Sequence, residues 1–150
     1  MSYTNLLYHI VTSTKNRAPY ISKSWRNDLH AYLGGEVRGM SGTALEVGGV
    51  ADHIHLLAKL PPTLSVSEFM AKLKASSSSW SKRKSGEQFA WQNQYAAFTV
   101  SESQVDSVRD YIRNQEEHHQ SASFEDEFKA RVPKARRLAL GYIIPTAIAA

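Results

Sequence analysis

The sequence contains no cysteine, which excludes disulfide bridges and thiolate metal ligands. Any metal ion must therefore be held by histidine, carboxylate or amide groups. No stretch approaches the roughly 18 apolar residues that span a bilayer, and the amino terminus lacks a basic segment followed by an apolar run. These absences predict a cytoplasmic protein with no membrane segment.

The composition is that of an ordinary globular protein, with 42% hydrophobic and 21% charged residues. A length of 150 residues favours one domain with a substantial core. The formal net charge of +4 permits a polyanionic partner such as nucleic acid without requiring one.

The spacing of apolar residues predicts strands and helices in a definite order. Segments rich in β-branched and aromatic residues predict strands at 3–14, 43–50, 53–60 and 91–100. Apolar residues at helical spacing predict helices at 22–40, 65–84 and 101–120. The order strand, helix, strand, strand, helix, strand is that of a ferredoxin-like α+β sandwich, an antiparallel sheet with helices packed on one face.

Two histidines, His53 and His55, lie in the third predicted strand. Because successive side chains of a strand point to opposite faces, both imidazoles point to the same face. Two neutral imidazoles at a fixed separation make half of a site for a divalent metal. Two surface histidines on a half-exposed strand explain the same pattern, and the tripeptide alone does not decide between these interpretations.

Tyr111 and Gln115 lie one turn apart on the third predicted helix, at the border of its apolar face. A tyrosine hydroxyl can act as a nucleophile, but its pKa of about 10 means that it needs a cation or a base at neutral pH. The amide oxygen of Gln115 is a hard ligand that can complete a two-histidine site for Mg²⁺ or Mn²⁺. The alternative is a tyrosine whose hydroxyl lies in water beside a solvated glutamine.

Three blocks of the sequence follow one another in a pattern of a known family: Tyr8–Arg17 (YHIVTSTKNR), Ala51–Leu57 (ADHIHLL) and Tyr111–His119 (YIRNQEEHH). Together they resemble the small single-tyrosine HUH transposases of bacterial insertion sequences and their relatives associated with repetitive extragenic palindromes. The resemblance runs from about residue 3 to residue 128. It predicts a transposase domain at 1–128 and a divergent C-terminal tail at 129–150.

The resemblance implies that His53 and His55 are the metal-binding histidines, that Tyr111 is the nucleophile and that Gln115 completes the metal site. Mg²⁺ or Mn²⁺ is the implied cofactor. The implied reaction is cleavage and rejoining of single-stranded DNA with hairpin ends through a covalent 5′-phosphotyrosine intermediate. The implied assembly is a homodimer with composite active sites, in which the nucleophile helix of one subunit can serve the histidine pair of the other.

Basic residues are candidates for contacts with DNA phosphates. They follow the first predicted strand or crowd one face of the second predicted helix: Lys15, Arg17, Lys72, Lys74, Lys82, Arg83 and Lys84. A solvated helix face explains the helical group as well. Trp80 and Trp91 are candidates for stacking on unpaired bases, although Trp80 lies on the apolar face of its helix.

Two other functions fit the same residues. One is a catalytically idle or domesticated module that binds hairpin DNA. The other is a metal-dependent phosphodiesterase with a water nucleophile, which releases a free 5′-phosphate and never forms a protein adduct.

Overall fold

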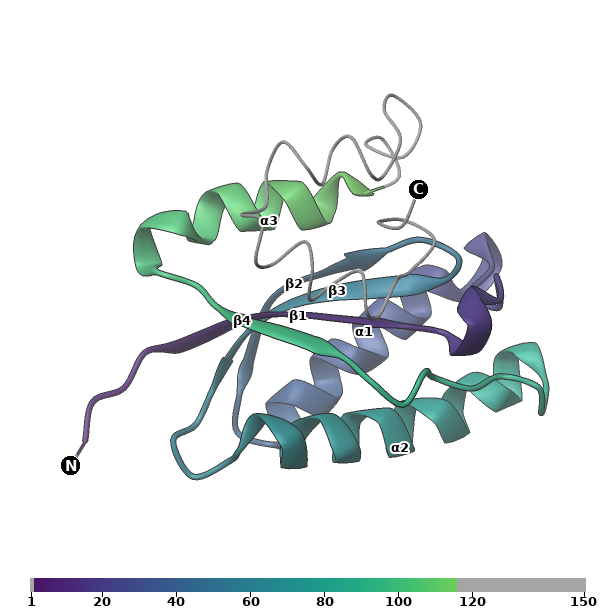
Figure 1. Ribbon diagram of the computed structural model, residues 1–150, viewed down its shortest axis with the longest axis horizontal. Coiled ribbons are helices and arrows are strands. Elements are labelled where there is room, and N and C mark those ends of the chain that lie inside the picture. Colours follow the sequence, from purple (N-terminus) through teal and green to yellow (C-terminus); the bar gives the residue numbers. More distant parts are fainter. Residues whose placement is uncertain (1, 116–150) are drawn as a thin grey trace.

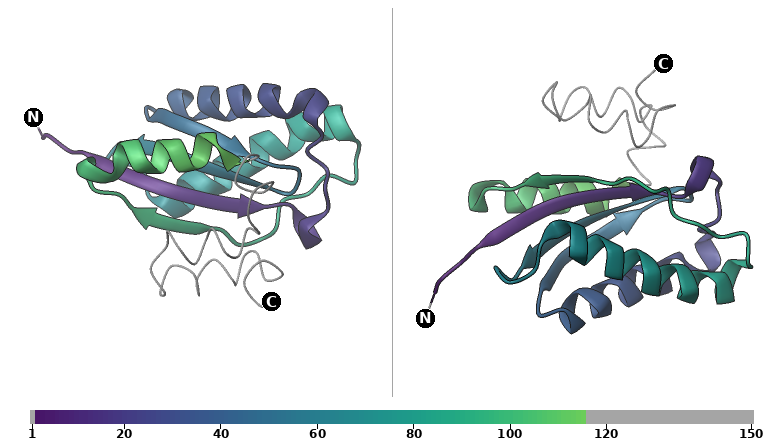
Figure 2. Two further views of the ribbon diagram at one scale, coloured as in Figure 1. Left: turned by 90° about the horizontal axis from the view of Figure 1, so that it is seen from above. Right: turned by 60° about the horizontal axis from the view of Figure 1, so that its bottom comes forward.

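The computed structural model describes residues 2–115, which form a four-stranded antiparallel sheet with helices on both faces (Figures 1 and 2). The strands are β1 (Leu6–Ser13), β2 (Thr43–Gly49), β3 (His53–Leu60) and β4 (Ala96–Thr99). The helices are α1 (Lys23–Gly39), α2 (Val66–Ser85) and α3 (Val105–Arg113), with short 3-10 turns η1 (Lys15–Arg17) and η2 (Glu102–Gln104). The strand order β2-β3-β1-β4 confirms the predicted ferredoxin-like α+β class.

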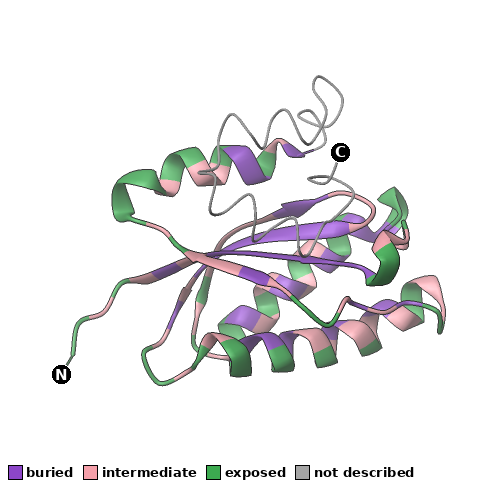
Figure 3. Ribbon diagram, viewed as in Figure 1, coloured by how far each residue is buried: buried purple, intermediate pink, exposed green. Residues whose placement is uncertain are grey.

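One face of the sheet is covered by α1 and α2, and it carries the main core. Alternate side chains of β3, including Ile54 and Leu56, pack there with Leu29 and Leu33 of α1 and with Phe69 of α2. Each fully buried side chain of this size stabilises the fold by about 1.5–3 kcal/mol. The central strands are buried along most of their length, whereas the outer sides of the helices are exposed (Figure 3). The sequence predicted helices packed on one face of the sheet, and α1 and α2 are packed in this way.

The third helix lies on the opposite face of the sheet, across from α1 and α2 (Figure 1). There Tyr111 and Ile112 form a small buried cluster with Leu57 of β3. A β-carbon at Gly48 of β2 would clash with the carbonyl oxygen of Ile112, so glycine permits α3 to approach the sheet this closely. The close approach of α3 holds its last turn over the end of β3 that carries the two histidines.

Some predicted boundaries differ from the structure. Residues 91–95 were predicted to belong to the fourth strand, but β4 begins at Ala96 and only an isolated bridge joins Trp91 to Thr14. Gln92 still donates its N–H to the carbonyl oxygen of Ser13 in β1. Lys74 of α2 donates to the carbonyl oxygens of Gln92 and Gln94, so a lysine side chain also holds this segment.

The third helix begins at Val105 after the turn η2, and not at residue 101. Its predicted extension to residue 120, the predicted domain boundary at 128 and the predicted tail at 129–150 lie outside the described residues. Among residues 2–115, no helix has the length and hydropathy to cross a membrane.

Candidate functional site

His53 and His55 lie side by side on the face of β3 that α3 covers. Their ring centroids are 5.2 Å apart and the rings are nearly perpendicular, at 74°. Both side chains are 0% exposed, which excludes the interpretation as surface histidines on a half-exposed strand. The predicted sharing of one strand face is confirmed, because Ile54 between them packs into the core on the other side.

Each of the two histidines is held through its Nδ1 atom. Nδ1 of His53 lies 2.7 Å from Oδ1 of Asp52. Nδ1 of His55 lies 2.9 Å from Nε2 of His9, a buried residue of β1. A neutral imidazole that donates from Nδ1 carries its lone pair on Nε2, and metal-ligating histidines in proteins are usually fixed in this way by a second partner. Asp52 therefore gives His53 the support that a metal-binding histidine needs, and His9 gives His55 the same support when its Nε2 accepts from Nδ1 of His55.

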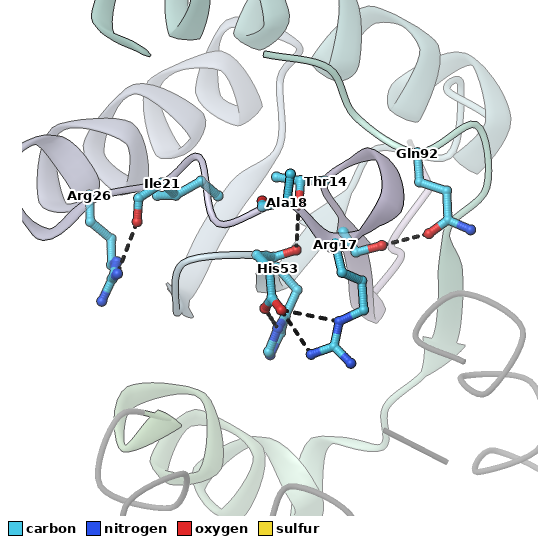
Figure 4. A network of polar contacts seen from close by, with 9 residues as sticks. Thr14, Arg17, Ala18, Ile21, Arg26, His53 and Gln92 are labelled. Carbon is cyan, nitrogen blue, oxygen red and sulfur yellow. Dashed lines mark hydrogen bonds and ion pairs between the residues drawn. The ribbon is translucent and has the colours of Figure 1, made fainter. Parts of the chain in front are cut away.

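Asp52 links His53 to Arg17, which follows β1. Nη2 of Arg17 lies 2.9 Å from Oδ2 of Asp52, so the guanidinium and the imidazole converge on one carboxylate (Figure 4). Burial raises the pKa of the Asp52 carboxyl, but the hydrogen bond from His53 and the charges of His53 and Arg17 outweigh burial and leave the pKa below its ordinary value. The carboxylate is therefore ionised at neutral pH and favours a proton on Nδ1 of His53.

Tyr111 lies against the histidines within the same chain. Its ring centroid is 5.6 Å from that of His55, with the rings at 88°, and 6.4 Å from that of His9. The side chain is only 6% exposed, which excludes the alternative of a tyrosine whose hydroxyl lies in open water. The helix and the strand thus bring together residues that are more than fifty positions apart in the sequence.

Gln115 follows one turn after Tyr111, as predicted. Its Nε2 donates to the carbonyl oxygen of Tyr111 at 3.1 Å, and the residue is 2% exposed. Its Oε1 is buried and accepts no hydrogen bond from the part of the chain that the structure describes. Because a buried acceptor without a donor costs about 1–3 kcal/mol, this oxygen is suited to a ligand. We refer to His9, His53, His55, Tyr111 and Gln115 as the tyrosine–histidine cluster.

The donor set fits a divalent cation. His53 and His55 supply ring nitrogens, and Gln115 supplies a buried amide oxygen with no donor among the described residues. Within residues 2–115 no group of three or more histidine, aspartate or glutamate side chains is arranged to hold a metal, and among these residues the amide oxygen of Gln115 is the candidate for a third ligand. A mixed nitrogen and oxygen set with no sulfur is compatible with Mg²⁺ or Mn²⁺.

The predicted DNA-binding residues fall on two sides of the sheet. Arg17 alone of these residues contacts a neighbour of the histidines, through Asp52. The others on α2 lie on the opposite face of the sheet: Lys72, Lys74, Lys82, Arg83 and Lys84. Lys15 is exposed at η1. Burial lowers the pKa of Lys74 from 10.5 to about 8, and its ammonium donates to two backbone carbonyl oxygens, so this lysine ties α2 to the segment before β4.

The two tryptophans differ in their surroundings. Trp91 is buried and its Nε1 donates to Oγ of Ser77 at 2.9 Å, so the expectation that it stacks on DNA bases is wrong. Trp80 packs against the core and stacks on Tyr32, with ring centroids 5.0 Å apart. Both rings are thus engaged within the fold.

Sequence reasoning missed His9, whose contact with His55 depends on strand pairing. In the β1–β3 pair Val11 lies opposite His55, and His9 lies opposite Leu57. His9 is therefore a diagonal neighbour of His55 on the same face, within reach of a long side chain. Alternation along β1 shows only that His9, Val11 and Ser13 share a face. It does not show which residues of β3 they lie beside, because the register between the two strands is set by the fold.

Comparisons with known proteins find relatives of this chain in sequence and in fold. The profile of a protein family described as "Transposase IS200 like" matches residues 2–115. Transposases for the insertion sequence element IS200 from Salmonella typhimurium and Salmonella typhi are each 32% identical to this chain over 118 residues. Each of these matches covers 74% of this chain and 77% of the relative.

Two solved structures have a similar fold. A Deinococcus radiodurans protein assigned as a transposase superposes with a TM-score of 0.60 at 23% identity, over 76% of this chain and 93% of that chain. A REP-associated tyrosine transposase solved with a REP hairpin superposes with a TM-score of 0.60 at 15% identity, over 79% of this chain and 72% of that chain.

Proposed function

The chain belongs to the family of IS200-like transposases, and from this premise we propose that it cuts and rejoins single-stranded DNA with Tyr111 as the nucleophile. The observation that carries the proposal is the buried contact between Tyr111 and His55, at 5.6 Å between ring centroids in a single chain. Family membership establishes a DNA transposase in general terms. The proposal adds the reacting residue and the chemistry.

The phenol oxygen of Tyr111 attacks phosphorus of a phosphodiester, and the bond from phosphorus to the 3′ oxygen breaks. The 3′ oxygen leaves with a proton as a 3′-hydroxyl, and the 5′ phosphate stays on the tyrosine. This link conserves the energy of the phosphoester, so a second 3′-hydroxyl reverses the step and rejoins the strand with no nucleotide cofactor. Burial of Tyr111 excludes bulk water, which protects the intermediate from hydrolysis.

We assign a cofactor role to three residues of the tyrosine–histidine cluster. His53, His55 and Gln115 would hold Mg²⁺ or Mn²⁺, which when bound polarises a non-bridging phosphate oxygen and offsets the charge of the transition state. The Asp52 carboxylate accepts from Nδ1 of His53 and so fixes the tautomer in which Nε2 of His53 carries the lone pair. We assign the matching role to His9, which would accept from Nδ1 of His55. Gln115 is oriented by its hydrogen bond to the Tyr111 carbonyl, so the proposed ligand is tied to the backbone of the proposed nucleophile.

The proposed substrate is single-stranded DNA with hairpin ends. Supporting this choice, one protein of similar fold was solved with a REP hairpin. The proposed assembly is a homodimer, for which two site arrangements are open. The resemblance implied that α3 serves the partner's histidines, whereas the intrachain contact of Tyr111 with His55 favours a site built within one subunit.

The proposal is tested by incubating end-labelled single-stranded hairpin DNA with the protein and Mg²⁺ or Mn²⁺. Wild type is expected to retain label through denaturing electrophoresis, and Tyr111→Phe is expected to retain none. Equal binding by both proteins with no adduct would identify an idle hairpin-binding module. A free 5′-phosphate with no adduct would identify a phosphodiesterase with a water nucleophile.

A further inference from the structure

A polar cavity of about 430 Å³ lies beside the tyrosine–histidine cluster, at the open edge of the sheet. Its walls come from the first turns of α1, the end of the edge strand β2 and the end of α3. The lining residues of α1 are Lys23, Arg26, Asn27 and His30. Arg113, the last residue of α3, and Gln115, which follows α3, also line the cavity. We refer to this space as the α1–α3 cavity.

The charged groups of the α1–α3 cavity are predominantly cationic. Lys23, Arg26 and Arg113 face one acidic residue, Glu46. The carboxylate of Glu46 is already ion-paired, with Oε1 lying 2.9 Å from Nη2 of Arg113 and 3.7 Å from Nε of Arg109. The formal charge of the lining is therefore positive with His30 neutral, which favours an anion.

Arg26 is the most deeply placed of these cations. Its side chain is 7% exposed, and Nη2 donates to the carbonyl oxygen of Ile21 at 2.9 Å (Figure 4). This bond fixes the planar guanidinium at the cavity wall, and the donor pattern of guanidinium matches the oxygens of a phosphate. A fixed, buried guanidinium loses little side-chain freedom when an anion binds.

The start of α1 also makes the electrostatic potential in the cavity more positive. Its N-cap residue Ser22 makes no side-chain capping bond, and the first turn contains no acidic residue. The positive end of the helix dipole and the first-turn N–H groups therefore add to the field of Lys23 and Arg26. None of the lining residues is phenylalanine, tyrosine or tryptophan, so the cavity offers no ring for a base to stack on.

The α1–α3 cavity is continuous with the tyrosine–histidine cluster. Gln115 belongs to both, and Gly48 in the cavity wall lies opposite His55 in the β2–β3 pair. We propose that the cavity binds a backbone phosphate of the single-stranded DNA next to the phosphate that reacts. This inference rests on the proposed function, because it assumes that the reacting phosphate lies at the cluster.

The test measures equilibrium binding of a 20-nucleotide oligothymidylate to the full chain carrying Tyr111→Phe, without divalent metal, over a series of salt concentrations. Lys23→Gln and Arg113→Gln are each expected to weaken binding about threefold and to reduce the slope of log affinity against log salt by about 0.7, the effect of one lost phosphate contact. Glu46→Gln is expected to strengthen binding, because it removes the acid from the cavity and keeps an acceptor for Arg113. Thermal melting of each variant verifies that it is folded.

The matched control is Arg38→Gln, which removes an exposed cation from the last turn of the same helix, outside the cavity. It is expected to leave affinity and slope unchanged. Equal losses of affinity in Arg38→Gln and in the cavity variants would show that the overall charge of the protein attracts DNA, and would overturn the proposal. Unchanged affinity in the cavity variants would also overturn it, as would a parent protein that does not bind the oligonucleotide. Formation of the DNA adduct is measured separately, with Tyr111 intact. If no adduct forms but the cavity variants bind DNA more weakly as expected, the proposed chemistry is wrong and the proposed phosphate site stands.

Discussion

Nε2 of His9 and Nδ1 of His55 lie 2.9 Å apart, in a buried contact between the two central strands of the sheet. The rings stack at 25° with centroids 5.2 Å apart, so both the bond and the packing fix the orientation of His55. The partner of His55 is thus another imidazole, whereas the partner of His53 is the carboxylate of Asp52. If His55 binds the metal as proposed, His9 is a positioning residue that acts through it.

Replacing His9 separates its bonding role from its packing role. His9→Leu removes the partner of Nδ1 of His55, which would accept from that atom in the metal-binding tautomer, and is expected to lower Mn²⁺ affinity by about 10- to 100-fold, the usual effect of losing the partner of a ligating histidine. His9→Gln retains an acceptor oxygen and is expected to keep most of the affinity. The measurement is titration calorimetry with Mn²⁺ on folded protein, and equal affinities for the two variants would show that the bond is unimportant.

Gly48 is expected to tolerate no side chain. Gly48→Ala places a methyl group against the Ile112 carbonyl and should push α3 away from β2, with a loss of about 1–3 kcal/mol in the free energy of unfolding. Gly35→Ala is the control, because a β-carbon there meets nothing within 4 Å on an exposed face of α1. The control should stabilise the protein by up to about 1 kcal/mol. Urea denaturation measures both, and two changes of the same sign would contradict the packing described for α3.

Lys74 is expected to titrate far below an ordinary lysine. Burial lowers its pKa from 10.5 to about 8. Between these two pH values the unfolded chain binds more protons at Lys74 than the folded chain does. The contribution of Lys74 to the free energy of unfolding therefore rises with pH between about 8 and 10.5. The unfolding free energy of wild type minus that of Lys74→Met should therefore be flat well below pH 8 and increase above it. An NMR titration of the Lys74 side chain gives its pKa directly, and a midpoint near 10.5 would contradict the burial argument.

Mixing two inactive variants tests whether Tyr111 serves its own subunit. If the site is built within one chain, then chains carrying His53→Ala and chains carrying Tyr111→Phe leave no intact site in any combination. The account therefore predicts no DNA adduct after the two are mixed and allowed to exchange. Adduct formation in the mixture, carried by the His53→Ala chain, would mean that α3 reaches the histidines of a partner subunit.

The sequence predicted the local parts of the site well. Alternation along a strand was sufficient to place His53 and His55 on one face, and helical spacing was sufficient to place Gln115 one turn after Tyr111. Their roles as metal ligands and nucleophile remain predictions. The order of strands and helices also predicted the fold class, because this order has few compact antiparallel solutions.

What the sequence could not provide was the pairing between distant segments. The contact of His9 with His55 depends on the register of β1 against β3, and the burial of Trp91 depends on Ser77 of α2. The position of α3 on the second face depends on the close approach at Gly48, which has no signature in local periodicity. Each of these features arises from long-range packing, which local propensity does not determine.

Mass spectrometry of peptides from wild-type protein, after reaction with single-stranded hairpin DNA and Mn²⁺, shows directly whether Tyr111 is the nucleophile. We expect one modified peptide, with a nucleotide attached through its 5′ phosphate to the oxygen of Tyr111, and loss of the modification in Tyr111→Phe. A nucleotide on any other residue, or cleaved DNA with no modified peptide, would show that Tyr111 is not the nucleophile.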